Sequence, residues 1–458
     1  CQFIRAEPQT IAYPQPAGWF AIPELEAISI TPAKLIILTE YESDELWSKI
    51  KKDQIKIFND NETTEISNEL ISLKIDKKTC AFLELKCKDV NNNQNLLRGT
   101  QSNLHFGFLD DYPHDHAWNL KPQYWKFPLH DIKNNENVEI KIEDQGYIFS
   151  SVLIKRTLGN QKSDVEQKIT LFKDIPIIYI DWRANWKQPF VFLKILYSTA
   201  TNANVSVSDQ AYCAIERKTQ PTTPCDKARY EKIMHKYVDL STPDNRWGVS
   251  LLNEGKYAYD TMGEAGDLRL SLLRTPRYPT PAGEAWVVQE RKYNKEKYGH
   301  DVPEFSGLGL ERCRYALYPH KDGALRDHSG NPTLEVKKRA EEFNRHVIII
   351  PNINENEVII SNNLLISISP SNVYLGAFKL DEWNKDGNLI LRIVEGAGFD
   401  SEAEIKFNPL LGNKLKNIQP VDLLEREFDK KIDWNKNKST LRFSIGKFEI
   451  CTLKLFLC

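Results

Sequence analysis

The sequence has few cysteines for its length and lacks long apolar runs. Its 458 residues include eight cysteines, and none of them form the Cys-x-x-Cys pairs typical of zinc ribbons. A long chain with so few cysteines is not a disulfide scaffold, so we expect a reducing, cytoplasmic compartment. The longest apolar stretches, such as 347–350, fall far short of the roughly 20 residues that a membrane-spanning helix needs. The sequence therefore predicts no such helix.

An excess of charge of either sign is also lacking. The 61 lysines and arginines nearly balance the 63 aspartates and glutamates, which leaves a formal net charge of -2. Binding to phosphate backbones or to anionic lipid depends on a basic surface, and this composition provides none. We therefore expect neither nucleic acid nor membrane as a partner.

The common catalytic motifs are absent as well. The sequence contains no Gly-x-Ser-x-Gly, no His-Glu-x-x-His and no phosphate-binding Gly-x-x-x-x-Gly-Lys-Ser/Thr. His320-Lys321-Asp322 matches a bare His-x-Asp pattern, but three positions in a charged stretch are weak support for a metal ligand. Asp110, Asp111 and Asp115 are formal candidates for the carboxylate pair of a glycosidase, whose separation a sequence does not give.

A period of two residues dominates what is present. Apolar and polar residues alternate as in strands with one solvated face, and turn-forming Asn, Asp, Gly and Pro lie between them. The pattern predicts an all-β fold with few helices, the clearest helix being 333–344, where Glu335 and Arg339 lie one turn apart. The clearest strands are expected at 71–76, 138–143, 268–272 and 441–445.

Composition divides the chain into three parts. Residues 1–65 are interrupted by prolines and end in a polar run, which indicates a small β unit and a linker. Residues 66–345 form a large β domain that ends in the charged helical segment. Residues 346–458 begin with an apolar run and form a terminal β-sandwich domain. Because the chain starts with Cys1 rather than methionine, we expect further sequence upstream of it.

One segment combines aromatic, histidine and aspartate side chains. Residues 110–119 read DDYPHDHAWN and contain Tyr112, His114, Asp115 and Trp118. Aromatic faces stack on sugar rings while Asp and His bind the hydroxyls, so a sugar-facing loop is one interpretation. A structural hydrogen-bond network and a divalent-metal site stay open. Arg217, beside Glu216, is either a further sugar-facing residue or half of a solvated ion pair.

Four ordered blocks carry a resemblance to a known family. They are ARYEKIMHKYVDLS (228–241), RWGVSLLNEGKYAYD (246–260), LRLSLLRTPRYPTP (268–281) and RYALYPH (314–320). Together they resemble the carboxy-terminal region of the family-38 glycoside hydrolases, the α-mannosidases, and most of all the cytosolic branch. The resemblance extends from about residue 60 to the end of the chain.

The resemblance implies a large galactose-mutarotase-like supersandwich followed by a smaller β-sandwich. It implies part of a retaining enzyme that removes terminal α-D-mannosyl units from glycans. In that family the catalytic carboxylates and a zinc ion belong to an amino-terminal barrel, and no block of that barrel appears here. We therefore assign no catalytic or metal-binding residue, and we expect the chain alone to be inactive.

The missing barrel would be a partner in cis or as a separate chain, and self-association stays open. The expected role of the β domain is to shape the sugar cleft, and the residues implied to face the sugar are Tyr112, His114, Asp115, Trp118 and Arg217. Two other functions stay open. One is a non-catalytic carbohydrate-binding β-sandwich protein, and the other is a mutarotase-like aldose epimerase, which would need a histidine and a carboxylate.

Overall fold

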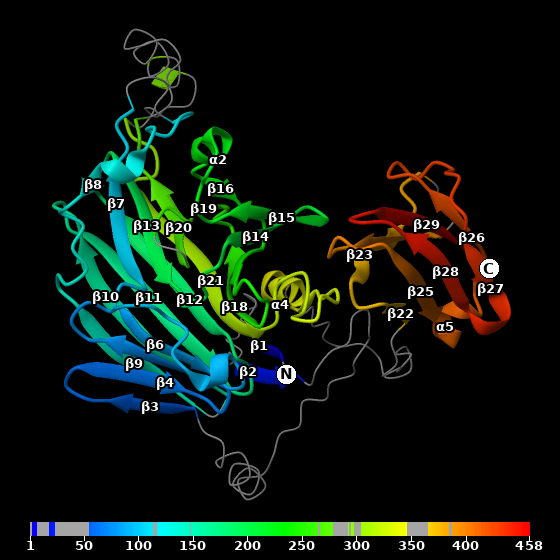
Figure 1. Ribbon diagram of the computed structural model, residues 1–458, viewed down its shortest axis with the longest axis horizontal. Helices are drawn as coiled ribbons and strands as arrows, with labels where there is room; N and C mark the ends of the chain where they lie inside the picture. Colours follow the sequence, from blue (N-terminus) through cyan, green and yellow to red (C-terminus); the bar gives the residue numbers. More distant parts are fainter. Residues whose placement is uncertain are drawn as a thin grey trace, which may run out of the picture. The chain divides into compact units, whose positions relative to one another are not determined.

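The computed structural model describes residues 2–6, 18–22, 55–112, 117–146, 148–263, 266–277, 292, 295–296, 304–345, 365–383 and 387–458. Strands make up most of this part of the chain, which confirms the predicted all-β fold (Figure 1). The chain forms two compact units. The larger contains residues 50–206 and 216–321, and the smaller contains residues 1–49, 207–215 and 322–458. The three-part division predicted from composition stays a prediction.

Nine strands form the largest sheet, in the order β15-β14-β17-β18-β21-β12-β11-β10-β9. Its described pairings are antiparallel, and the 13-residue strand β21 lies near its centre between β18 and β12. In chain order the strands are β9 (Glu139–Gln145), β10 (Phe149–Leu158), β11 (Ser163–Phe172), β12 (Ile178–Trp186), β14 (Val205–Gln210), β15 (Cys213–Lys218), β17 (Tyr237–Ser241), β18 (Trp247–Glu254) and β21 (Gly309–Lys321).

Six further strands form the second sheet of the larger unit, in the order β16-β19-β20-β13-β7-β8. They are β7 (Leu104–Leu109), β8 (Pro128–Leu129), β13 (Val191–Ser198), β16 (Lys232–Ile233), β19 (Ala258–Asp260) and β20 (Asp267–Arg274). A four-stranded sheet precedes them, with β3 (Lys56–Asn59), β4 (Thr63–Ser67), β5 (Ile71–Asp76) and β6 (Phe82–Cys87). One buried apolar core joins all three sheets, so they fold as a unit.

The smaller unit contains a sandwich of two four-stranded sheets around its own apolar core. The strands of one sheet are, in spatial order, β22 (Ile366–Ser369), β25 (Ser401–Phe407), β28 (Thr440–Ile445) and β27 (Asp433–Asn435). The strands of the other sheet are, in the same sense, β23 (Val373–Leu380), β24 (Leu389–Glu395), β29 (Ile450–Leu457) and β26 (Leu415–Val421). The amino-terminal strands β1 (Gln2–Ala6) and β2 (Gly18–Ile22) pair with each other.

Helices are short and few in the described residues. The longest is α4 (Glu335–Asn344), which confirms the helix predicted at 333–344 and its Glu335–Arg339 pair, with 3.0 Å between Arg339 Nε and Glu335 Oε1. The others are α2 (Pro224–Ala228), α5 (Pro409–Gly412) and the 3₁₀ turns η2 (Asn91–Asn93), η3 (Tyr124–Lys126) and η4 (Lys436–Lys438). In the part of the chain that the structure describes, no helix is long and apolar enough to span a membrane.

Candidate functional site

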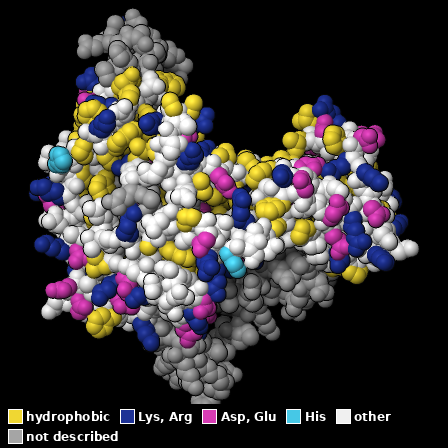
Figure 2. Space-filling model, viewed as in Figure 1, with side chains coloured by type: hydrophobic (Ala, Val, Ile, Leu, Met, Phe, Trp, Pro, Cys, Tyr) yellow, Lys and Arg dark blue, Asp and Glu magenta, His cyan; other side chains and the backbone are white. Residues whose placement is uncertain are grey.

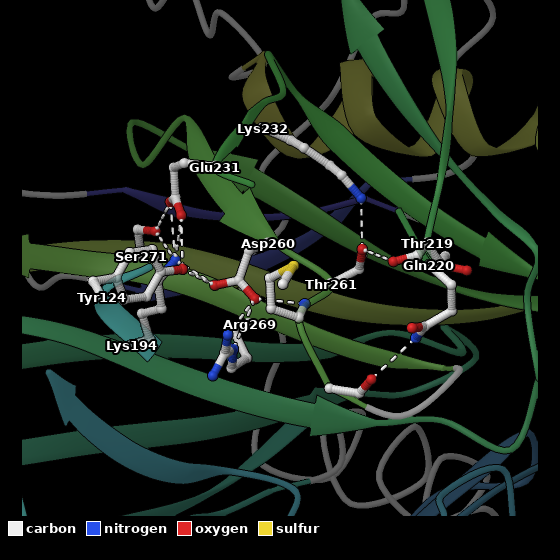
Figure 3. A network of polar contacts seen from close by, with 12 residues as sticks. Tyr124, Lys194, Thr219, Gln220, Glu231, Lys232, Asp260, Thr261, Arg269 and Ser271 are labelled. Carbon is white, nitrogen blue, oxygen red and sulfur yellow. Dashed lines mark hydrogen bonds and ion pairs between the residues drawn. The ribbon is translucent and has the colours of Figure 1, made fainter. Parts of the chain in front are cut away.

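A buried lysine lies at the centre of a charged network in the six-stranded sheet (Figure 3). Lys194 belongs to β13, a strand whose eight residues are all buried, so its ammonium group has no access to solvent. The Nζ atom lies 2.8 Å from Glu231 Oε2 and 2.8 Å from Asp260 Oδ2, and it donates to Ser271 Oγ at 2.7 Å. A buried ammonium requires such anionic partners, since the charge would otherwise be unstable.

The second half of the network surrounds Asp260, which is also fully buried. Arg269, on the neighbouring strand β20, donates from Nε to Asp260 Oδ1 at 2.8 Å. The hydroxyl of Tyr124 donates to Asp260 Oδ2 at 2.5 Å, and its oxygen also lies 3.1 Å from Glu231 Oε2. The network is therefore neutral overall, because the two carboxylates balance the ammonium of Lys194 and the guanidinium of Arg269. Tyr124 covers one side of it.

The environment moves the pKa values of the two carboxyl groups in opposite directions. Burial raises the pKa of Glu231, and the attraction of Lys194 only partly offsets this rise. Burial also opposes ionisation of Asp260, but Lys194 and Arg269 outweigh it and hold the pKa of this carboxyl below its usual value. Asp260 is therefore the permanent anion, whereas Glu231 is the carboxyl that takes up a proton first.

A second lysine lies beside this group without a direct carboxylate contact. Lys232 Nζ donates to Thr261 Oγ1 at 2.5 Å and to the Lys218 carbonyl at 2.9 Å. Burial lowers the pKa of Lys232 to about 8, and Arg217 acts in the same direction. Both hydrogen-bond acceptors are neutral, which explains why they do not compensate for burial.

Aromatic rings surround Tyr124. Tyr124 packs edge-on against Trp125, Tyr230 and Phe192, with ring centroids 5.4, 5.9 and 5.0 Å apart. Trp125 and Tyr230 are only partly buried and pack against each other at 5.2 Å. Figure 2 shows hydrophobic side chains gathered at this end of the larger unit, over β7 and β8. The charged network thus lies directly beneath a partly exposed aromatic surface.

The structure places three of the five predicted sugar-facing residues. Tyr112 is half-buried and lies near Tyr230. The pKa of Tyr230 is raised by burial first, and also by Glu231 and Tyr112. Trp118 is 73% exposed. Arg217 lies on β15, and its Nη1 donates to the Ile233 carbonyl at 3.5 Å. His114 and Asp115 lie outside the described residues, so the role predicted for the five stays a prediction.

The segment that carries Trp118 is held by one arginine. Arg274 binds Asp110 through two contacts, Nε to Oδ2 at 2.9 Å and Nη2 to Oδ1 at 2.8 Å. Its Nη2 also donates to the Asn119 carbonyl at 2.8 Å. Asp110, a formal candidate for a glycosidase carboxylate, is 1% exposed and engaged in this contact. Its observed role is to anchor Arg274, which in turn positions residues 117–119.

Sequence reasoning missed Lys194, Glu231, Asp260 and Arg269 as a group. Glu231, Asp260 and Arg269 stand inside the blocks that carry the family resemblance, but nothing in their spacing showed that they meet. The one sign of a buried charge in the sequence was a charged residue within an apolar strand, as in VFLKILYS around Lys194. A lysine in such a strand must find a carboxylate partner.

No metal-binding cluster was assigned to the chain, and the described residues contain no group of three or more His, Cys, Asp or Glu side chains that could hold an ion. The His-x-Asp pair does not converge on one point. His320 Nε2 lies 2.8 Å from Asp239 Oδ1, whereas Asp322 contacts His328. The residues that the structure describes therefore do not fit a zinc ion.

Two family models match the chain in consecutive order. The model for the glycosyl hydrolases family 38 C-terminal domain matches residues 66–282, and the model for the family 38 C-terminal beta sandwich domain matches residues 372–453. The first covers most of the larger unit, and the second covers most of the sandwich of the smaller unit. Together they include most residues of both apolar cores.

Curated relatives and a solved structure agree with these matches. An alpha-mannosidase of Saccharomyces cerevisiae is 26% identical over 317 residues, which cover 64% of this chain and 25% of the relative. Alpha-mannosidase G of Dictyostelium discoideum is 30% identical over 175 residues, 38% of this chain and 13% of the relative. The chain thus spans a quarter or less of the length of these relatives.

The fold is also that of a bacterial crystal structure. An alpha-mannosidase from Enterococcus faecalis superposes with a TM-score of 0.59 at 14% sequence identity, over 86% of this chain and 42% of that one. This likeness concerns the fold alone. The two family models and the curated relatives show that the chain belongs to glycosyl hydrolase family 38 and carries the C-terminal region of that family.

Proposed function

We propose that the chain is the carboxy-terminal part of a retaining α-mannosidase that hydrolyses terminal α-D-mannosyl linkages in glycans. The aromatic surface above the Lys194 network faces the sugar. Zinc and the reacting carboxylates come from a barrel outside this sequence, in cis or as a separate chain. The complete enzyme works in the cytoplasm, in keeping with the sparse cysteines.

One observation carries this proposal. The aromatic side chains Trp125 and Tyr230 are partly exposed, and a buried acid–base network supports them from below through Tyr124 and Glu231. Rigid aromatic faces beside hydrogen-bonding groups are suited to a pyranose ring, whose faces are apolar and whose edge carries hydroxyls. A site held by such contacts keeps its geometry when a sugar binds.

The residues of this chain would bind and orient the sugar rather than react with it. Trp118 and Tyr112 offer faces to the ring, while Arg274 fixes the segment that carries Trp118. Arg217 adds a donor at the β15 side. No catalytic step is assigned to these residues. Retention requires a nucleophile and an acid about 5–5.5 Å apart on either side of the glycosidic bond, and Asp260, the carboxylate next to Glu231, is fully buried and paired with Lys194 and Arg269. Zinc would stabilise charge on the sugar hydroxyls when bound by the barrel.

Titration with methyl α-D-mannoside tests the binding role. We expect saturable chemical-shift or calorimetric changes with a dissociation constant of about 1 mM or weaker. Tyr112→Ala, Trp118→Ala and Trp125→Ala should each weaken binding at least about fivefold. Tyr257→Ala removes another exposed ring of the same unit, one that is 53% exposed, and is the control. Binding that none of the site variants weakens would contradict the proposed surface.

Two further measurements separate this proposal from its alternatives. The purified chain should not hydrolyse an aryl α-mannoside with added zinc, and robust turnover would mean that it contains a catalytic pair. Coding sequence for a zinc-binding barrel, upstream or in a neighbouring gene, would favour the divided enzyme over an independent sugar-binding protein. Mutarotation of a free aldose, followed by polarimetry, would indicate the epimerase instead.

A further inference from the structure

A buried arginine in the core of the larger unit has no anionic partner among the residues that the structure describes. Arg156, on β10, is 2% exposed. Its Nη1 donates to the Thr79 carbonyl at 3.1 Å and to Asn134 Oδ1 at 3.2 Å, and its Nη2 donates to Gln167 Oε1. All three acceptors are neutral, so they satisfy donors of the guanidinium without balancing its charge.

The acidic groups around the guanidinium are neutral as well. Cys80, Tyr197 and Tyr315 are the acids that act on Arg156, and burial raises the pKa of each of them. They therefore keep their protons at neutral pH. A buried charge without a counter-ion is costly, because the protein interior solvates it far less well than water does. The same burial lowers the pKa of Arg156 from its ordinary value.

Two buried hydrogen-bond donors beside this charge have no acceptor in the described part of the chain. One is Nε of Arg156 itself, and the other is Nδ1 of His105, a residue that is 1% exposed. His105 Nε2 accepts from Trp182 Nε1 at 2.9 Å, so the proton of the neutral ring lies on Nδ1. Buried donors without acceptors are rare in folded proteins, and a bound ion or an ordered water is a usual explanation.

The two donors belong to one neighbourhood. Asn134 Oδ1 accepts from the backbone amide of His105 at 2.8 Å and from Arg156 Nη1 at 3.2 Å. These two bonds use both lone pairs of the amide oxygen, so it has none left for the imidazole. Burial lowers the pKa of His105 first, and the positive charge of Arg156 lowers it further, as expected of a near neighbour.

A monatomic anion suits these groups better than water does. A water molecule could accept both hydrogen bonds, but its own two hydrogens would then need acceptors. An anion only accepts, and it also balances the guanidinium charge. Side chains buried as deeply as Arg156 and His105 leave little room for a polyatomic anion. Asn134 is only partly buried, so solvent lies nearest on that side.

We infer that the larger unit binds a chloride ion in its core, with Arg156 Nε and His105 Nδ1 as the donors. The ion is structural. It joins β10 of the nine-stranded sheet to β7 of the six-stranded sheet, since these strands carry Arg156 and His105. The inference concerns the core alone and does not depend on the proposed sugar surface.

Thermal melting at constant ionic strength tests this inference. Sodium chloride is exchanged stepwise for sodium gluconate, whose anion is too large for the site. With a dissociation constant of about 10 mM, about 100 mM chloride should raise the melting temperature by about 3 °C over gluconate. The response should saturate, whereas general effects of salts on stability keep growing with concentration.

Three variants locate the response. Arg156→Gln removes the charge and should abolish the effect of chloride. Arg156→Lys keeps the charge but not the Nε donor, and it should weaken chloride binding at least about tenfold. Arg98→Gln is the matched control, because Arg98 pairs with Asp267 at 2.7 Å and its charge is already balanced. This control should respond to chloride as the wild type does.

X-ray diffraction from wild-type crystals grown in bromide gives a readout that does not depend on a variant folding. We expect an anomalous peak within hydrogen-bond distance of Arg156 Nε and His105 Nδ1. The absence of this peak would overturn the inference, and equal stability in chloride and gluconate would do so too. In both cases an ordered water would serve the two donors instead. A chloride response that Arg156→Gln retains, or that Arg98→Gln loses, would place the ion elsewhere and would equally contradict the assignment.

Discussion

Lys194 and Asp260 form an ion pair with 2.8 Å between Nζ and Oδ2, and both side chains are completely inaccessible to solvent. They come from different parts of the six-stranded sheet, Lys194 from β13 and Asp260 from the end of β19, with β20 between them. The pair ties the sheet together beneath the aromatic surface. Its contribution depends on the whole group, because Glu231 and Arg269 complete the charge balance.

Lys194→Met should destabilise the larger unit by about 3–5 kcal/mol, since it leaves buried carboxylates without their cation. Glu231 can relieve part of this cost by taking up a proton, because burial already raises its pKa. The loss should therefore be smaller at pH 5 than at pH 8. Urea unfolding at the two pH values measures both effects.

Lys155→Met is the matched control for that variant. Lys155 pairs with Glu166 at 2.7 Å, but the two side chains are 44% and 41% exposed. Solvent screens an exposed pair, so its removal should change stability little. Equal losses in the two variants, or a Lys194→Met loss that does not vary with pH, would contradict the account of the network.

His105 should make the larger unit less stable as the pH falls below about 6.5. This imidazole is buried, and burial together with Arg156 lowers its pKa well below 6.5. Its Nε2 accepts a hydrogen bond from Trp182 Nε1 at 2.9 Å, which a protonated ring could not do. The folded state thus excludes a proton that the unfolded state binds.

The sign follows from proton linkage. Between the depressed folded pKa and 6.5 the unfolded chain binds more protons, so stability rises with pH by up to about 1.4 kcal/mol per unit. The contribution is fully present above 6.5 and is lost as the pH falls. His105→Gln keeps an acceptor for Trp182 and should remove this part of the slope, whereas His235→Gln on an exposed side chain should not. Unchanged slopes in both variants would be evidence against a neutral His105.

The strands could be predicted from the sequence because a half-buried strand leaves a local pattern. The alternation at 71–76 corresponds exactly to β5, and that at 441–445 lies within β28. Helix α4 was likewise visible from its charged pair. Each of these elements is determined by residues that lie close together in the sequence, so the local pattern is enough to predict it.

The network could not be predicted in the same way, because its members come together only through sheet pairing. Lys194 and Asp260 are 66 positions apart in the sequence, and β13 and β19 are separated by β20. The aromatic residues were recognised, but the charges beneath them were not. Alternation predicts that a side chain faces inward without giving the strand order that determines its partner.

Arg274→Lys should loosen residues 117–127 while the rest of the unit stays folded. Lysine keeps the charge but cannot make the two parallel contacts to Asp110 or reach the Asn119 carbonyl in the same geometry. Amide hydrogen exchange in this segment should accelerate by about tenfold, which corresponds to about 1.4 kcal/mol of local stability. Arg246→Lys, at a side chain 75% exposed, is the control. Exchange that rises uniformly across the unit would indicate a global effect instead.

Gly248 packs against a second buried polar group, formed by His320, Asp239 and Ser250 on the nine-stranded sheet. A Cβ atom at this position would lie 2.6 Å from Ser241 Oγ and 2.7 Å from His320 Cε1, so both side chains would have to move. His320 is held by Asp239 at 2.8 Å and by Ser250 at 3.0 Å, and it cannot shift without breaking these contacts.

Gly248→Ala should therefore destabilise the larger unit by about 1–3 kcal/mol in chemical denaturation, as overpacking does in other cores. Adding Ser241→Ala removes the nearer of the two obstacles and should recover part of the loss, since the two changes share one contact. Gly446→Ala in the smaller unit meets its nearest atom at 3.4 Å and should have little effect. A Gly248→Ala chain as stable as the wild type would mean that Ser241 and His320 can move apart freely, and the contacts to Asp239 would then not fix the imidazole.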